Sequence, residues 1–164
     1  MTTLTFAAFL QASILAANPD SYVEAHREAQ RGTPMVVMVT ADWCSPCQQM
    51  KKTILPQVRK LGLLEKVAFA MVNVDRDRPL AKKLIGGGPV PQLIMYRKTA
   101  SGWRRRGLVG GQSVRTVEKF INEGLVLSQA DQDAEAASTD AKQQTQAPEQ
   151  AAKAPKVKPV SRQQ

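Results

Sequence analysis

The chain has 164 residues, of which 43% are hydrophobic but only 5% aromatic, so it suits one domain with extensions and a mostly aliphatic core. Its two cysteines and single histidine exclude a disulfide-stapled miniprotein and a zinc site built from four Cys and His ligands. The formal charge is +9, and no run of residues has the length and apolar character of a membrane-spanning helix.

Residues 1–19 form an apolar N-terminal segment that carries no charged side chain. This pattern fits the apolar core of an export signal, although no Lys or Arg precedes it. It fits a short helix packed on the domain equally well. Both interpretations stay open, so the sequence is compatible with a cytoplasmic and with an exported or periplasmic protein.

Residues 20–127 alternate between helix and strand patterns and are predicted to form the folded domain. We expect helices at residues 21–30, 44–52, 79–84 and 113–123, and strands at residues 35–39, 67–74, 92–97 and 103–109. The first two strands are continuous apolar runs, typical of parallel strands buried on both faces. Pro56 is expected to bend or end the second helix, and Gly124 to end the last one. The order βαβα followed by ββα predicts an α/β sandwich.

Residues 128–164 differ in composition from the rest of the chain. They are rich in Ala, Gln and Pro, contain no aromatic residue, and their acidic and basic side chains cancel. Such a segment buries too little apolar surface to offset the entropy of ordering, so we predict a disordered tail. Its role is open between a solubilising tail and a weak anchor for an anionic surface, since four bases lie in its last twelve residues.

The chemistry is predicted to lie in Cys44-Ser45-Pro46-Cys47, between a buried strand and the start of a helix. Unpaired amides and the helix dipole stabilise a thiolate there, so the pKa of Cys44 should fall below that of a free thiol. Cys47 lies one turn away, within reach of a disulfide. Cys44 would attack a substrate disulfide and Cys47 would resolve the mixed disulfide. A structural disulfide and a metal site are the weaker alternatives for such a pair.

Two separate motifs carry a family resemblance. Trp43-Cys44-Ser45-Pro46-Cys47 follows a buried strand, and Val90-Pro91 precedes another strand about 44 residues downstream. Over roughly residues 20–126 the chain therefore resembles the thioredoxin superfamily, in its thioredoxin-like and disulfide-interchange branches. The resemblance implies the thioredoxin fold, a central mixed sheet flanked by helices.

The resemblance also implies roles for residues outside the cysteine pair. Pro91 would be a cis-proline packed against the cysteines, and the backbone of Val90 would pair with an extended substrate segment. Gly110 would leave room for that substrate, and Trp43 would form part of the apolar contact surface.

The chain departs from the family pattern at three positions. Met38 stands where family members often bury an Asp beneath the cysteines, and Met71 where a Lys often accompanies it. The usual proton acceptor for Cys47 is therefore missing, so we expect slower resolution, with the proton passing to water or to a nearby group such as Asp42. Ser45 replaces the usual Gly, so the redox potential of thioredoxins cannot be transferred.

These observations predict a monomeric thiol–disulfide oxidoreductase that acts on protein disulfides. It would need no metal or organic cofactor, and its electrons would come from a partner reductase or another dithiol protein. The sequence leaves open whether the reaction runs as reduction, oxidation or isomerisation. The main alternative is a thioredoxin-like adaptor that binds proteins through the same groove and turns over poorly. A polyanion-binding protein is a third possibility, although we expect no specific nucleic-acid binding and no membrane span.

Overall fold

The computed structural model describes residues 20–151, with side chains as far as residue 138. A four-stranded mixed sheet forms its centre, in the order β2-β1-β3-β4. The strands are β1 (Met35–Thr40), β2 (Ala68–Asn73), β3 (Gln92–Thr99) and β4 (Gly102–Val109). β1 runs parallel to β2 and antiparallel to β3, and β3 and β4 form an antiparallel hairpin. The predicted mixed sheet is confirmed, whereas the apolar segment 1–19 lies outside the described residues.

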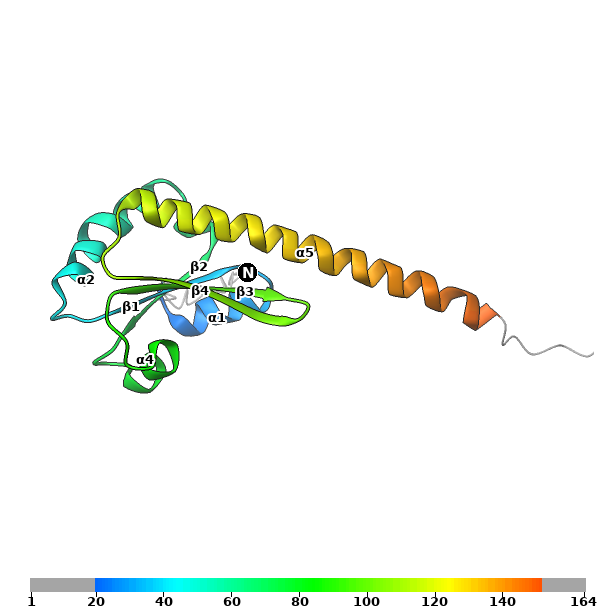
Figure 1. Cartoon of the computed structure of the whole chain (residues 1–164), viewed down its shortest axis with the longest axis horizontal. Helices are drawn as coiled ribbons and strands as arrows, with labels where there is room; N and C mark the ends of the chain where they lie inside the picture. Colours follow the sequence, from blue (N-terminus) through cyan, green and yellow to red (C-terminus); the bar gives the residue numbers. More distant parts are fainter. Residues whose placement is uncertain (1–19, 152–164) are drawn as a thin grey trace, which may run out of the picture.

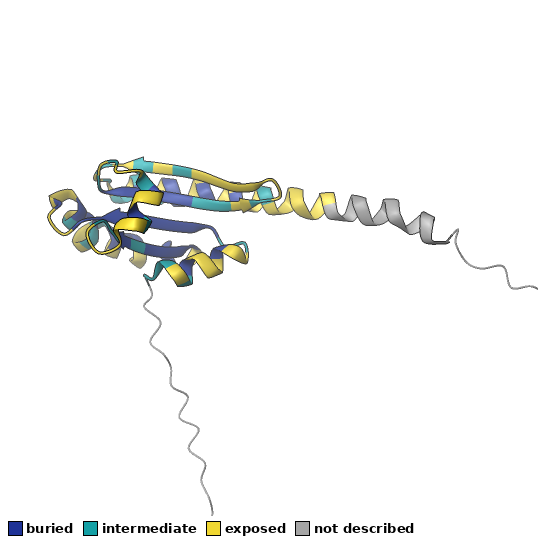
Figure 2. Ribbon diagram, turned by 90° about the horizontal axis from the view of Figure 1, so that it is seen from below, coloured by how far each residue is buried: buried dark blue, intermediate teal, exposed yellow. Residues whose placement is uncertain are grey.

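Helices cover both faces of the sheet (Figure 1). α2 (Ser45–Gln49), α3 (Leu55–Lys60) and α5 (Val114–Ala151) lie on one side, and α1 (Tyr22–Gln30) and α4 (Arg78–Ile85) on the other. A short 3₁₀ helix, η2 (Leu64–Lys66), precedes β2. All six residues of β1 are buried, because helices cover both of its faces, and the centre of the sheet is therefore dark blue in Figure 2.

The side chains on the two faces of the sheet form two separate cores. The cysteine face holds both cysteines together with large side chains, including Met38, Met50, Met95, Leu93 and Phe120. The second face is built from small and β-branched side chains, including Ala25, Ala29, Val37, Val39, Ala70 and Ala81. Alternate residues of β1 point to opposite cores, as the two-residue period of a strand requires.

The helix that begins within the cysteine motif is longer than expected. The prediction ended it near residue 52 or bent it at Pro56, but helical backbone continues from α2 through η1 (Met50–Ile54) into α3 and ends at Lys60. η1 is a turn of π-helix. Pro56 cannot donate to the carbonyl one turn before it, and its ring would crowd that carbonyl in a regular α-helix. The wider π-turn just before it lets the chain stay helical.

The prediction that Gly124 ends the last helix is wrong. α5 continues through Gly124 to Ala151, and Gly124 is not among the glycines with positive φ. A Cβ atom at Gly124 would overlap the Sδ of the buried Met95 on β3. The glycine is therefore needed for close packing of α5 on the sheet, and not for a helix end.

Part of the segment predicted as a disordered tail contacts the domain. Ser128 is buried, Asp131 forms an ion pair with Arg97, and the Gln132 side chain donates to the carbonyl of Gly32 at 3.1 Å. Residues 128–151 continue α5, and the described side chains after Gln132 are exposed (Figure 2). Residues 152–164 lie outside the described part of the chain. None of the described helices is long and apolar enough to cross a membrane.

Candidate redox site

The cysteine pair lies where β1 ends and α2 begins. Cys44 is the N-cap of α2, with φ −89° and ψ 108°, and Cys47 lies in the first helical turn. The two residues form a disulfide with their Cα atoms 5.2 Å apart. The backbone N–H of Cys47 donates to Cys44 Sγ at 3.3 Å. This sulfur therefore already receives one of the unpaired amides at the helix start, which is the contact that would stabilise a thiolate.

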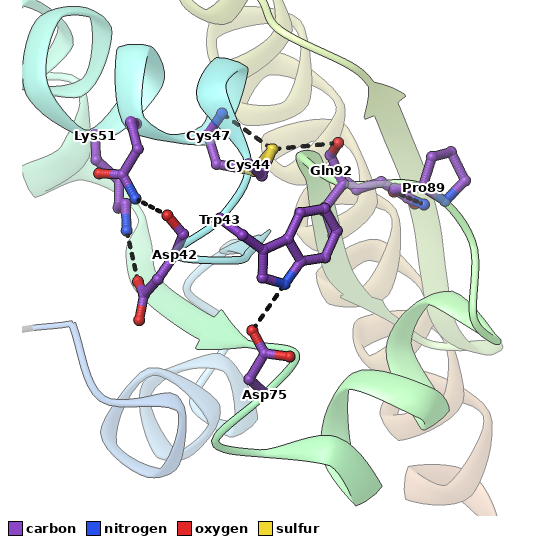
Figure 3. Close-up of a disulfide and its surroundings, with 10 residues drawn as sticks. Asp42, Trp43, Cys44, Cys47, Lys51, Asp75, Pro89 and Gln92 are labelled. Carbon is purple, nitrogen blue, oxygen red and sulfur yellow. Dashed lines mark hydrogen bonds and ion pairs between the residues drawn. A yellow bond between two sulfur atoms is a disulfide. The ribbon is translucent and has the colours of Figure 1, made fainter.

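The two sulfurs differ in their surroundings. Cys44 keeps 6% of its surface accessible, whereas Cys47 is fully buried at 0%. The Sγ of Cys44 also lies 3.6 Å from the carbonyl oxygen of Val90 (Figure 3). Cys44 thus faces the edge of the domain and Cys47 faces the core. This asymmetry favours Cys44 as the sulfur that meets a substrate.

The Val90-Pro91 peptide bond is cis, as the resemblance implied. The carbonyl of Pro91 accepts the backbone N–H of Gly110 at 2.8 Å, so the two segments lie side by side next to the disulfide. Gly110 has φ +87°, and a Cβ there would meet no atom within 4 Å. The space beside Gly110 is therefore open, as a position that borders a bound substrate requires.

Two residues of this region escaped the sequence analysis. A Cβ at Gly111 would lie 3.3 Å from the Cβ of Pro46, so Gly111 lets the loop after β4 approach the motif closely. The buried Gln92 donates from Nε2 to the carbonyl of Pro89 at 2.9 Å and fixes the segment before the cis bond (Figure 3). The two consecutive glycines after β4 could have indicated the close approach of Gly111 to Pro46, whereas nothing in the sequence indicated the hydrogen bond of Gln92.

Trp43 is 71% exposed, yet its indole is held in place. Its Nε1–H donates to Asp75 Oδ2 at 3.0 Å, across 32 residues of sequence (Figure 3). The ring borders a groove of about 650 Å³ beside the disulfide. The groove is lined by Trp43, Val74, Asp75, Arg78, Ala81, Lys82, Ile85, Gly86, Gly87, Gly88, Pro89 and Val90. The resemblance indicated Trp43 and Val90 at this surface, but not the contribution of α4.

The glycine-rich stretch before Val90 forms the far wall of this groove. Gly86 has φ +60° and donates its N–H to the carbonyl of Lys82 at 2.8 Å, which ends α4. Gly88 donates to the carbonyl of Ile85 at 2.9 Å. These hydrogen bonds make the stretch a defined helix-ending turn.

The surroundings of Cys47 are apolar. Met38 on β1 is fully buried in the same core as Cys47, and it pairs in register with Met71 on β2, which packs against that core. Among residues 20–138, the buried polar side chains are Thr40, Gln92 and Ser128, and none of them is a carboxylate. The positions of Met38 and Met71 agree with the expectation that Cys47 lacks a buried proton acceptor.

Asp42 is poorly suited to accept that proton. Its carboxylate is exposed and bonds to Lys51 at 3.2 Å and to Arg76 at 2.8 Å, and Figure 3 shows it directed toward Lys51. The hydrogen bond from Lys51, aided by the charge of Arg76, lowers the pKa of Asp42 below its ordinary value of 3.8. Such a carboxylate stays ionised and is a weak base near neutral pH.

Metal-binding side chains do not gather in the described part of the chain. Residues 20–138 hold no group of three or more His, Cys, Asp or Glu side chains arranged to bind an ion. The candidate site described above consists of the cysteine pair, the cis-proline segment and the groove beside them.

Comparisons with known proteins agree with this geometry. The family model for thioredoxin matches residues 14–123. Thioredoxin 1 of Chlorobaculum tepidum is 29% identical over 84 residues, which cover 50% of this chain and 78% of that protein. The thioredoxin of Rickettsia typhi is 23% identical over 94 residues, covering 56% and 82%. The solution structure of a thioredoxin from Thermus thermophilus has the same fold, with a TM-score of 0.57 at 24% identity, covering 66% of this chain and 86% of that one.

Proposed function

The chain belongs to the thioredoxin family and is a thiol–disulfide oxidoreductase, and we propose that it reduces protein disulfides with Cys44 as attacking and Cys47 as resolving residue. The single observation that carries the assignment of the two cysteines is their difference in exposure. Cys44 lies at the edge of the domain beside Val90, whereas Cys47 is closed off by the core. The likeness to proteins named thioredoxin supports the reductive direction.

The proposed reaction begins with both cysteines reduced. The Cys44 thiolate attacks one sulfur of the substrate disulfide, a new S–S bond forms between protein and substrate, and the other substrate sulfur leaves and takes up a proton. Cys47 then loses its proton, attacks Cys44 Sγ and breaks the mixed disulfide. The second substrate sulfur leaves and takes up a proton. Two electrons and two protons have passed to the substrate, and the protein holds the Cys44–Cys47 disulfide.

The substrate backbone is proposed to bind along the cis-proline segment. Val90 presents its carbonyl 3.6 Å from Cys44 Sγ, and Gly110 leaves open space on the neighbouring loop. A peptide that pairs with the backbone of Val90 would bring its own disulfide to the attacking sulfur. Holding the two reacting sulfurs together in this way supplies much of the rate enhancement of such a reaction.

Electrons must return to the disulfide after each turnover. We propose a partner reductase or a second dithiol protein as their source, since the thioredoxin family works with such partners. We also propose that the protein acts as a monomer, which the mass of the full chain in solution would test. 

The experiment that tests the function is disulfide reduction in insulin with dithiothreitol as electron donor. The wild-type chain should accelerate the reduction, and Cys44→Ser should return the rate to that of dithiothreitol alone. In a separate incubation without dithiothreitol, the pre-reduced Cys47→Ser variant should keep the attacking thiol and form a mixed disulfide with insulin, seen as a mass increase that dithiothreitol then removes. Cys44→Ser, which keeps the core but lacks the attacking sulfur, is the matched control for this trapping.

The alternative of a binding adaptor gives a different result in the same assay. It is favoured by the apolar surroundings of Cys47, where Met38 and Met71 leave no buried base. Wild-type turnover no faster than that of Cys44→Ser, with retention of the same protein partners by both, would support the adaptor and contradict the proposed reductase.

A further inference from the structure

One wall of the groove beside the disulfide is a single face of α4. Four of its lining residues, Arg78, Ala81, Lys82 and Ile85, follow the spacing of three and four residues that places side chains on one helix face. The opposite end of the groove reaches Val90, whose carbonyl lies 3.6 Å from Cys44 Sγ. A substrate segment next to a disulfide attacked by Cys44 would therefore extend along α4.

The two positive charges on this wall outnumber the single negative charge that lines the groove. Arg78 and Lys82 are exposed, and neither forms an ion pair with any residue among those the structure describes. Asp75 is the one carboxylate that lines the groove, and its Oδ2 is engaged by the indole N–H of Trp43. The adjacent Arg76, by contrast, is paired with Asp42.

We propose that this groove selects substrate segments that carry Asp or Glu beside the disulfide. The inference rests on the proposed reductase function and adds the class of substrate to it. Arg78 and Lys82 lie one helical turn apart on this wall. They attract a carboxylate in the groove and repel a Lys or Arg, because a charge bound there lies within the screening length of about 8 Å at physiological salt. The occupant is a peptide segment of the disulfide substrate, because the groove extends to Val90 beside Cys44 Sγ and its cationic wall is complementary to carboxylates.

The test uses three disulfide-bonded peptides of one sequence that differ only in the residues flanking the bond, which are Glu, Gln or Lys. The second-order rate constant for their reduction by the fully reduced full-length chain is measured at low and at high salt. The Glu peptide should react about fivefold faster than the Lys peptide at low salt, with the Gln peptide between them. At about 0.5 M NaCl the three rates should converge, since exposed charges are screened.

Variants then assign the effect to the groove wall. The double variant Arg78→Glu/Lys82→Glu should reverse the order of the three peptides, and the milder Arg78→Gln/Lys82→Gln should abolish the preference. Lys83→Glu is the matched control for Arg78→Gln/Lys82→Gln, because it lowers the net charge by the same two units on the same helix, but Lys83 lines a different pocket together with Tyr22 and Trp103. Its preference should stay close to that of the wild type.

The outcomes separate the two proposals. Equal reduction of all three peptides by the wild type at low salt overturns the inference and leaves the reductase intact. A preference lost equally in Lys83→Glu and in Arg78→Gln/Lys82→Gln also overturns it, because the effect would then come from overall charge. Failure to reduce even the Gln peptide would remove the reductase function, and the substrate preference with it.

Discussion

The two faces of the central sheet are built from different kinds of side chain, although they share the same strands. On the cysteine face β1 contributes Val36 and Met38, and the helices add large residues such as Met50 and Phe120. On the second face, alanines of α1 and α4 pack against the small and β-branched residues of the strands. Small side chains let helices approach a sheet closely, whereas methionine adapts to irregular space such as that around a disulfide.

The two faces contribute different parts of the candidate site. The cysteine face supplies the sulfurs and their apolar surroundings, and α4 from the second face supplies the charged wall of the groove. They meet because β1 and β2 are parallel and end at the same edge of the sheet, where the cysteine motif and α4 follow them. The carboxyl ends of parallel strands are the usual place for a site in such folds.

The largest expected effect concerns the contribution of each face to stability. Phe120→Ala should lower the free energy of unfolding by about 3–5 kcal/mol, because the ring is buried and also lies 4.8 Å from the Arg106 guanidinium. Leu84→Ala on the second face should cost about 2–3 kcal/mol, because leucine is smaller than phenylalanine and its truncation leaves a smaller cavity. Urea unfolding measures both. A cost for Leu84→Ala above that for Phe120→Ala would contradict the contrast drawn between the faces.

The next effect concerns the close approach of α5 to the cysteine face. Gly124→Leu should lower the free energy of unfolding by about 1–3 kcal/mol, because its side chain would overlap the buried Met95. Val126→Ala is the control on the same helix, since Val126 is exposed and its loss should change stability by about 0.5 kcal/mol or less. If Gly124→Leu melts at the wild-type temperature, α5 does not pack as described.

A smaller, kinetic effect should follow from placing a base beside Cys47. Met38→Asp should speed resolution of the mixed disulfide about tenfold near neutral pH, because burial raises the pKa of a carboxyl and makes it a better proton acceptor. Met38→Asn is the matched control, since it is polar and of similar size but carries no base. Decay of the mixed disulfide is followed by rapid quenching and mass measurement. An unchanged rate in Met38→Asp would mean that another group already accepts the proton.

The smallest effect is expected at Asp42. Its lowered pKa keeps the carboxylate ionised above about pH 5, so it cannot titrate together with the thiols. Asp42→Asn should therefore change the reduction rate less than about twofold between pH 6 and 8. Because the pKa is depressed, any stability from the Lys51 and Arg76 pairs is present at neutral pH and is lost only as the pH falls below 3.8. A change in the shape of the pH–rate profile would assign Asp42 a direct role.

The sequence predicted the parts of the fold that depend on local pattern. The apolar runs of β1 and β2 and the cysteine motif were predicted from short stretches of residues, whereas the cis bond before Pro91 was implied by the family resemblance. Gly124 was misread because a glycine that ends a helix and one that permits close packing have the same sequence signal. The Trp43–Asp75 hydrogen bond and the α4 wall join distant parts of the chain, and no local pattern reports such contacts.

The π-helical turn between α2 and α3 sets the orientation of the cysteine motif. A wide turn of this kind corresponds to one extra residue in an otherwise regular helix, and each residue of an α-helix advances by about 100°. Removal of a single residue from Met50–Ile54 would restore regular α-helical spacing, in which the ring of Pro56 crowds a carbonyl, and would also rotate Cys47 away from the core that Leu55 and Val58 define. The extra residue of the π-turn thus lets Cys47 at the start of the helix and Leu55 and Val58 at its end face the same core.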